Sequence, residues 1–237
     1  MTFTLFLFIA LLAAAIASIT GFGTAMILIP FADLIIDLKQ AIVLVAFFHF
    51  FSNLFRLLRL RSSISFRLLL LYGLPSIATA YIGAILFGQL DVELISVIFA
   101  VFIIIFAVYS FIRPKWSLPD KKGVLIFGGA LSGLTAGLIG LGGAIRSMFL
   151  ISTNISKEAY IATSAAIAVL VDITRISIYL YNGNLDNQYY IYVIPLIGMA
   201  FLGTFLGVKL LVKLPELVVK RSVLVMLLVV AIVMLVD

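Results

Sequence analysis

The chain is dominated by a near-continuous series of apolar stretches, each long enough to cross the roughly 30 Å hydrocarbon core of a membrane. A water-soluble fold is excluded, because 65% of the residues are hydrophobic and only 11% are charged, against about 25% charged in a soluble domain. Lipid offers the backbone no hydrogen bonds, so these stretches should be helices. The sequence predicts an all-α, polytopic integral membrane protein of the cell (inner or plasma) membrane. The stretches lie near residues 3–36, 40–60, 66–88, 91–112, 122–153, 157–181, 188–212 and 216–236.

The composition removes most catalytic chemistry. The chain has no cysteine and one histidine, His49, so thiolate sites and most metal sites lack ligands. No phosphate-binding loop or hydrolase motif occurs in the sequence. The net charge of +6 comes from loops between apolar stretches, where membrane topology explains it without a nucleic-acid partner. We therefore expect no enzymatic activity, no cofactor and no metal.

Rare residues recur between the two halves of the chain. Glycine, proline and intramembrane arginine are scarce enough here for their matches to indicate an internal duplication. The stretch 113–122, with two prolines and five charges, separates the halves as a linker. We expect a first membrane repeat at 1–112, a cytoplasmic linker at 113–122 and a second membrane repeat at 123–237. An offset of 119 pairs Gly21 with Gly140, Gly23 with Gly142, Asn53 with Asp172 and Arg56 with Arg175, and an offset of 120 pairs Pro75 with Pro195 and Gly83 with Gly203.

The first apolar stretch of each half is long and interrupted by glycine, so it is either one kinked span or a re-entrant hairpin of two half-helices. Basic residues collect on the cytoplasmic side, and this rule separates the two readings. With single crossings, 8 basic loop residues lie inside and 6 outside; with hairpins, 13 lie inside and 1 outside. The hairpin reading gives three full crossings per half. It predicts oppositely oriented, inverted repeats with both termini outside.

The two glycine breaks are the first candidates for a binding site. Transporters with discontinuous helices hold their substrate between the repeats, and a helix that restarts after a break offers free N–H groups and a positive dipole end to an anion. The alternative is that these glycines only permit close helix packing. The candidate substrate-binding residues at the breaks are Thr20, Gly21, Gly23, Thr24, Gly140, Gly142 and Gly143.

Arg146 follows the second break by one turn, inside an apolar run. An arginine near the bilayer centre costs at least ~2.5 kcal/mol on insertion scales and usually faces a cavity or a partner. It is a candidate anion ligand. The alternative is that its long side chain snorkels to the nearer interface.

The next helix of each half carries a polar face. Asn53 and Arg56, like Asp172 and Arg175, are three residues apart and share a helix face, which His49 joins four residues before Asn53. Asn53, Arg56 and Arg175 are further substrate-binding candidates, and His49 and Asp172 are candidates for proton coupling. Alternatives remain: Asp172 and Arg175 could form a structural ion pair, and Arg56 could mark the cytoplasmic end of its helix. His49 could be a satisfied core residue.

Neutral polar side chains in the apolar stretches do not distinguish a transport path from ordinary helix structure. They could line a path for an anion, but hydroxyl groups also bond carbonyls within their own helix. These residues are Ser52, Ser152, Thr153, Asn154, Ser164, Thr174 and Ser177.

The two glycine motifs resemble a known pair of signatures. Thr20-Gly-Phe-Gly-Thr-Ala-Met-Ile-Leu-Ile-Pro30 and Ile139-Gly-Leu-Gly-Gly-Ala-Ile-Arg-Ser-Met-Phe149 are similar to the paired glycine-rich motifs of the TauE/SafE sulfite exporter family. The resemblance extends over nearly the whole chain, including the duplication and the basic linker. It implies an exporter of small sulfur-containing anions such as sulfite or sulfoacetate. The second motif departs from the family pattern, because Phe149 stands where the family commonly has proline and Arg146 interrupts the apolar run.

Together these features predict an alternating-access exporter whose anion lies between the two broken helices, held by backbone N–H groups and Arg146. Arg56 and Arg175 are ligands of second rank. The partners expected are the small anion and the lipid bilayer; the oligomeric state, a homodimer included, is left open. The alternatives are a channel-like anion conduit, and a membrane-embedded enzyme or assembly subunit.

Overall fold

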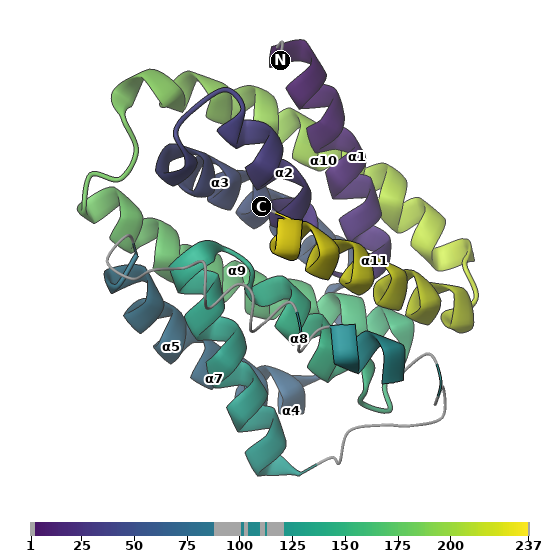
Figure 1. The fold of residues 1–237 in the computed structure, drawn as a ribbon. Coiled ribbons are helices and arrows are strands. Elements are labelled where there is room, and N and C mark those ends of the chain that lie inside the picture. The colour runs from purple at the N-terminus through teal and green to yellow at the C-terminus, as the bar shows by residue number, and fades with distance from the viewer. Residues whose placement is uncertain (1–2, 88–100, 102–103, 110–111, 113–120, 237) are drawn as a thin grey trace.

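The structure, a computed structural model, describes residues 3–87, 101, 104–109, 112 and 121–236 (Figure 1). The described chain is helical and contains no strand. Short 3₁₀ segments cover Arg61–Ser63 and Asn187–Tyr192, and a π-helical segment covers Leu69–Gly73. The α-helices are α1 (Phe3–Thr20), α2 (Thr24–Asp33), α3 (Leu38–Leu60), α4 (Phe66–Leu68), α5 (Leu74–Ile85), α7 (Lys122–Ile139), α8 (Gly142–Ile151), α9 (Lys157–Tyr181), α10 (Val193–Lys213) and α11 (Glu216–Val236).

The prediction of an all-helical polytopic membrane protein is confirmed. Within the described residues, six helical stretches are long and apolar enough to cross a membrane. The apolar segment expected near 91–112 and the linker at 113–122 lie largely outside the described residues, so the proposed repeat boundaries stay a prediction. The six stretches are Phe3–Thr20, Leu38–Ser63, Phe66–Ile85, Lys122–Ile139, Lys157–Tyr181 and Asn187–Lys213.

Local sequence signals explain several helix ends and one irregularity. Asp37 caps α3 by accepting a hydrogen bond from the Lys39 N–H at 2.9 Å, and Ser156 caps α9 in the same way. The π-helical segment ends at Gly73, two residues before Pro75. Proline has no N–H to donate and its ring clashes with the preceding turn, which loosens the helix at that point.

Helices from the two halves pack in a reciprocal pattern. α1 lies against α10, α7 lies against α5, and α3 lies against α9. Glycine permits the first two approaches: a Cβ at Gly203 of α10 would lie 2.3 Å from the Leu11 carbonyl oxygen, and one at Gly133 of α7 would lie 2.0 Å from that of Ser76. Small residues at four-residue spacing commonly let membrane helices approach this closely. The first helix of each half is therefore held mainly by the other half.

Each half begins with two helices of unequal length. α1 and α7 have 18 residues each, and α2 and α8 have 10 each, which correspond to about 27 Å and 15 Å. The chain reverses between the members of each pair, which pack against each other (Figure 1). The reversal agrees with a hairpin rather than a kinked span. The first limb of each pair is long and apolar enough to span a membrane by itself, so the prediction that both limbs are half-helices stays a prediction.

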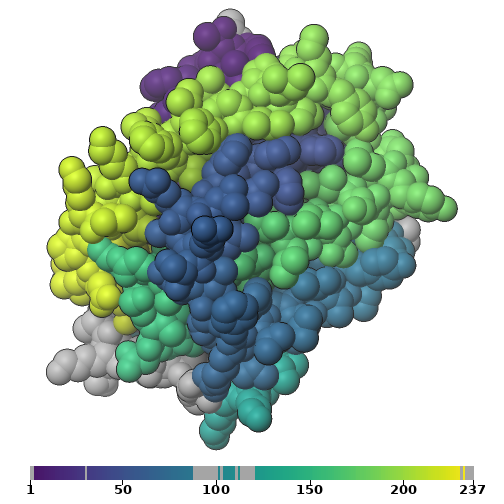
Figure 2. All heavy atoms as spheres, turned by 180° about the vertical axis from the view of Figure 1, so that it is seen from behind, coloured from purple at the N-terminus to yellow at the C-terminus, as the bar shows by residue number. Residues whose placement is uncertain are grey.

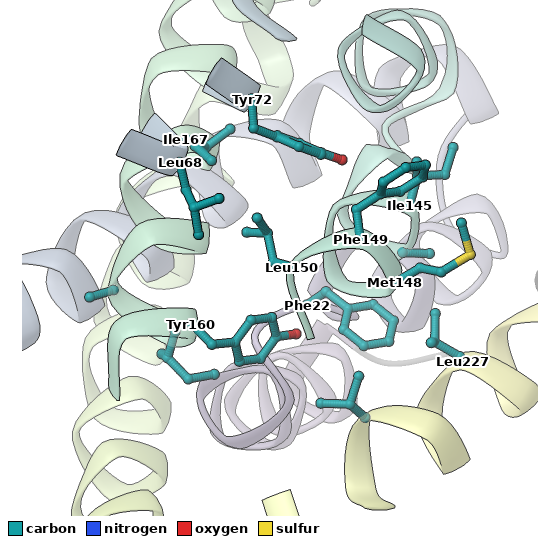
Figure 3. Close-up of a cluster of buried hydrophobic side chains, with 14 of the residues drawn as sticks. Phe22, Leu68, Tyr72, Ile145, Met148, Phe149, Leu150, Tyr160, Ile167 and Leu227 are labelled. Carbon is teal, nitrogen blue, oxygen red and sulfur yellow. The ribbon is translucent and has the colours of Figure 1, made fainter. Parts of the chain in front are cut away.

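A buried apolar cluster surrounds the first break. Phe22, which lies between α1 and α2, belongs to the same cluster as Phe149 of α8 and Tyr160 of α9 (Figure 3). Phe22 is 1% exposed. The break is thus inside the protein, enclosed by helices of the second half.

Candidate functional site

The two glycine breaks have the backbone conformation that glycine alone adopts freely. Gly21 and Gly23 have φ of 83° and 108°, and Gly140 has φ of 76°. These values lie in the left-handed region, where a Cβ is disfavoured. The Thr20 hydroxyl donates to the Phe22 carbonyl at 2.7 Å and closes the first turn. The sequence placed both breaks correctly.

The breaks approach each other at the centre of the protein. A Cβ at Gly143, in the first turn of α8, would lie 3.2 Å from the Cβ of Phe22. A Cβ at Gly140 would lie 3.1 Å from Nη1 of Arg175. Residues that are about 120 positions apart in sequence therefore form one site.

Helix α9 holds the carbonyl groups on both sides of this site. These carbonyls lie at or next to the C-terminal ends of α1 and α7, where a helix runs out of backbone donors; the Ala136 carbonyl also accepts a hydrogen bond from the Gly140 N–H at 3.0 Å. Two α9 side chains donate hydrogen bonds to carbonyls at the first break, and two donate to carbonyls at the end of α7. The bonds run from Tyr160 Oη to Thr20 O (2.6 Å), Ser164 Oγ to Gly21 O (3.2 Å), Arg175 Nη1 to Ala136 O (3.4 Å) and Tyr179 Oη to Gly137 O (2.6 Å).

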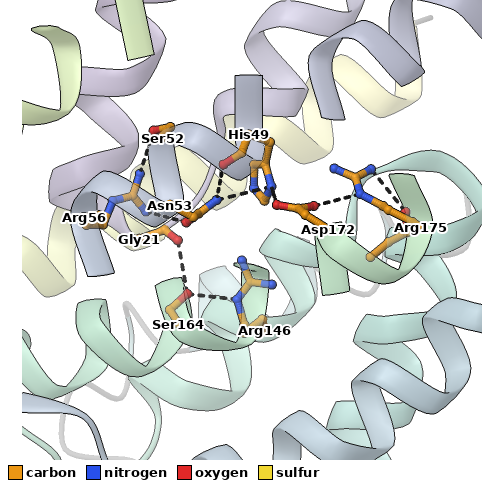
Figure 4. Close-up of polar contacts among 10 residues, drawn as sticks. Gly21, His49, Ser52, Asn53, Arg56, Arg146, Ser164, Asp172 and Arg175 are labelled. Atoms are coloured by element: carbon orange, nitrogen blue, oxygen red, sulfur yellow. Dashed lines mark hydrogen bonds and ion pairs between the residues drawn. The ribbon is translucent and has the colours of Figure 1, made fainter. Parts of the chain in front are cut away.

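Arg146 points into the site rather than toward lipid (Figure 4). It is 2% exposed, which excludes snorkelling to the membrane surface. Its Nε donates to the Ser164 hydroxyl at 2.9 Å, and that hydroxyl donates to the Gly21 carbonyl of the first break. Its Nη2 is buried without a hydrogen-bond partner in the described chain. A charged donor at the junction of the breaks is thus left free.

The polar faces of α3 and α9 meet in a buried network (Figure 4). Nδ1 of His49 lies 2.6 Å from Oδ2 of Asp172, and Arg175 Nε donates to Oδ1 of the same carboxylate at 2.8 Å. Nη1 of Arg56 donates to Oδ1 of Asn53 at 3.1 Å. The helix faces predicted from three- and four-residue spacing are confirmed. The Asp172–Arg175 ion pair, which was the structural alternative to substrate binding, forms, and His49 joins it from the other half; a role for these residues in binding or coupling stays a prediction.

Arg56 is not a marker of the helix end. It is 1% exposed, whereas Arg59 and Arg61, which follow it, are exposed. Nη2 of Arg56 donates to Ser52 Oγ at 3.4 Å, and its Nε has no partner among the described residues. Arg56 therefore belongs to the interior site.

The charge of this interior is not balanced. Arg56, Arg146 and Arg175 are buried, and Asp172 is the one buried carboxylate among the described residues. Two of the three guanidinium groups therefore lack an acidic partner when His49 is neutral. Buried charge is costly unless it is paired, so the arrangement is complementary to an anion.

The family is decided by the match of the chain to known family models. The model for the sulfite exporter TauE/SafE family matches residues 6–234. The chain belongs to the TauE/SafE sulfite exporter family. No curated protein and no solved structure shows significant similarity to the chain. Membership makes this multi-pass membrane protein one of a family of transporters of sulfite and related sulfur anions.

Other residues of the TauE/SafE motifs have packing neighbours. A Cβ at Gly142 would lie 2.2 Å from the Ser132 carbonyl oxygen, and one at Gly23 would lie 2.8 Å from Cε of Met226. Close packing by itself therefore requires glycine at Gly142. The Thr24 hydroxyl is buried without a partner in the described residues. A role for these three residues in anion binding stays a prediction.

Tyr160 and Tyr179, which complete the site, were not predicted from the sequence. Tyr160, Ser164, Asp172, Arg175 and Tyr179 follow one another along α9 at spacings of three, four or eight residues, so they form one polar stripe on an apolar helix. That stripe was the available signal. Among the described residues, no group of three or more His, Asp or Glu side chains could hold a metal ion.

Proposed function

We propose that this TauE/SafE protein exports a small sulfur-containing oxyanion, sulfite or a close relative, across the plasma (inner) membrane. The anion lies between the two glycine breaks and is bound by Arg146, with Arg175 and Arg56 as further ligands. The observation that carries the proposal is the free Nη2 of buried Arg146 at the junction of the breaks. Guanidinium groups bind oxyanions through two parallel hydrogen bonds.

The backbone adds to this binding. α2 and α8 both begin at the breaks, and neither has a side-chain cap at its N-terminus. Their first N–H groups and positive dipole ends face the region of the breaks, where an anion is favoured. The excess of two positive charges over the Asp172 carboxylate suits a doubly charged oxyanion better than a neutral solute.

Proton coupling follows from competition for Arg175. Asp172 holds Arg175 at 2.8 Å and contacts His49 at 2.6 Å. An arriving anion competes with the Asp172 carboxylate for the same guanidinium. A proton on the His49–Asp172 pair weakens the hold of the carboxylate and so favours the anion. Substrate and proton would then be bound together.

Alternating access uses the reciprocal packing. α1 with α10 and α5 with α7 form two closely packed pairs, and α3 and α9 lie against each other. Glycine lets the helices of each pair pack closely, which supports the idea that each pair moves as one unit. We propose that these units rock about α3 and α9 and expose the site to one side at a time, as inverted repeats do in other transporters.

Counterflow in proteoliposomes tests this function. Vesicles loaded with unlabelled sulfite should accumulate labelled sulfite transiently, and sulfoacetate, thiosulfate and sulfate inside should support this to different degrees. Empty vesicles and vesicles with Arg146→Met protein are the controls. Flux without counterflow and without saturation would indicate the channel-like alternative. Chemical conversion of the anion, or no flux at all, would favour an enzyme or an assembly subunit.

A further inference from the structure

A groove of about 720 Å³ opens on the outer surface between α3 and α10. It is distinct from the buried arginine site. On this face of the molecule α10, in yellow-green, lies alongside α3, in blue (Figure 2). The groove has two chemically different ends.

One end is aromatic and faces outward. Phe55 and Phe201 pack edge to face with ring centroids 5.2 Å apart, and Phe205 stacks on Phe201 at 6.4 Å. Phe201 is 49% exposed and Phe205 is 50% exposed. In a membrane-spanning helix such rings face hydrocarbon, so this end offers an apolar bed for an acyl chain.

The other end is basic. Arg59, Lys209 and Lys213 line it and are exposed, and none of them forms an ion pair within the described part of the chain. The helical rise from Phe201 to Lys213 is about 18 Å. This is close to the hydrocarbon depth of one leaflet, about 15 Å. The three cations therefore lie at headgroup level when the aromatic end lies in hydrocarbon.

We propose that this groove binds an anionic phospholipid. Its phosphate contacts Arg59, Lys209 and Lys213, and one acyl chain lies along the phenylalanine bed. Basic pockets between membrane helices bind anionic headgroups by this charge complementarity. The proposal does not depend on the transported substrate.

The groove suits a lipid better than a small hydrated anion on its way to the interior. Among the described residues, Thr204 is the one uncharged polar side chain that lines it. Thr204 is 2% exposed, and its hydroxyl lies 3.0 Å from Ser52 Oγ, to which it is already bonded. A small oxyanion that passed the cations would lose its hydration without gaining donors.

Thermal unfolding of the purified protein in detergent tests the lipid site. Dioctanoyl phosphatidylglycerol should raise the unfolding temperature in a saturable way, whereas dioctanoyl phosphatidylcholine and glycerol phosphate should not. The combined variant Arg59→Gln, Lys209→Gln and Lys213→Gln should bind phosphatidylglycerol at least tenfold more weakly. Each single variant, measured alone, should show part of this loss.

A matched control removes the same charge elsewhere. Lys39→Gln, Lys121→Gln and Lys122→Gln together change three exposed cations outside the groove, and this protein should keep wild-type affinity. Equal binding of phosphatidylcholine, or unchanged affinity in the groove variant, would overturn the proposal. Stabilisation by glycerol phosphate equal to that by phosphatidylglycerol would also overturn it and would indicate a small-anion vestibule. The readout is lipid binding, so a failed transport assay leaves this result intact.

Discussion

Replacing Arg146 tests whether this residue binds the anion or only stabilises the fold. Arg146→Met replaces arginine by a long unbranched apolar side chain and so removes the charge. Arg146→Lys keeps the charge and removes the planar guanidinium. In the structure Arg146 is 2% exposed, holds Ser164 at 2.9 Å and has a free Nη2. A ligand with this geometry should lose anion affinity when the charge is removed, without a loss of stability in the empty protein.

The magnitude follows from the contacts. A hydrogen bond to a charged group contributes about 1.5–3 kcal/mol, so removing the free Nη2 should cost about 2 kcal/mol of binding. That corresponds to roughly a 30-fold loss of affinity. The lysine variant should lose less, because it retains the charge. In the absence of anion, replacing a buried cation that lacks an acidic partner by an apolar side chain should leave the unfolding temperature unchanged or raise it.

Calorimetric titration with sulfite measures the affinity, and helical circular dichroism during heating measures the stability of the empty protein. Arg61→Met is the control. It removes an exposed cation at the C-cap of α3 and should change neither the sulfite affinity nor the stability. Wild-type sulfite affinity in folded Arg146→Met would remove Arg146 from the site. A large fall in empty-protein stability with normal affinity would assign it a structural role instead.

Three further predictions follow from the breaks, the topology and the polar network. Alanine at Gly21 or Gly140 should impair sulfite counterflow more than membrane insertion. Alanine at Gly183, which has φ of 66° and open space around it, imposes similar backbone strain and should leave transport intact. Equal counterflow in all three variants would contradict this prediction. A reporter fused to the C-terminus should be active outside the cell, and activity only in the cytoplasm would refute the re-entrant reading. His49→Gln should keep counterflow but lose the effect of an imposed proton gradient, since it removes the imidazole beside Asp172; an unchanged gradient effect would place coupling elsewhere.

The fold was readable from the sequence where local rules decide it. Hydropathy located the helices, and paired glycines located the breaks, because positive φ is a local property of glycine. Spacing placed Asn53 with Arg56 and Asp172 with Arg175 on shared faces, which the hydrogen bonds confirm. The lengths of the hairpin limbs could not be predicted, because hydropathy is continuous from Phe3 to beyond the break and does not mark where one helix ends and the next begins.

Contacts between the halves were not predictable in the same way. His49 and Asp172 are 123 residues apart, and nothing local to either residue specifies the other. The hydroxyl groups illustrate the same limit. Ser177 donates to a carbonyl of its own helix, as hydroxyls in membrane helices often do, whereas Ser164 connects Arg146 to Gly21. Only the assembled helices distinguish these two serines.

The proposed duplication supplies the scaffold of the site, but the two halves do not supply equal charge. At the offset of 119, the position that matches Arg146 is Ile27 in α2, and the position that matches His49 is Ala168 in α9. The second half therefore contributes two of the three buried arginines and the carboxylate, and the first half contributes the histidine that contacts it. Because the proposed charged ligands are concentrated on α8 and α9, an anion bound between the breaks would be drawn toward the second half. A rocking motion that exchanged the roles of the halves would then change its surroundings, so the outward-facing and inward-facing sites would differ in affinity although the backbone around them is repeated.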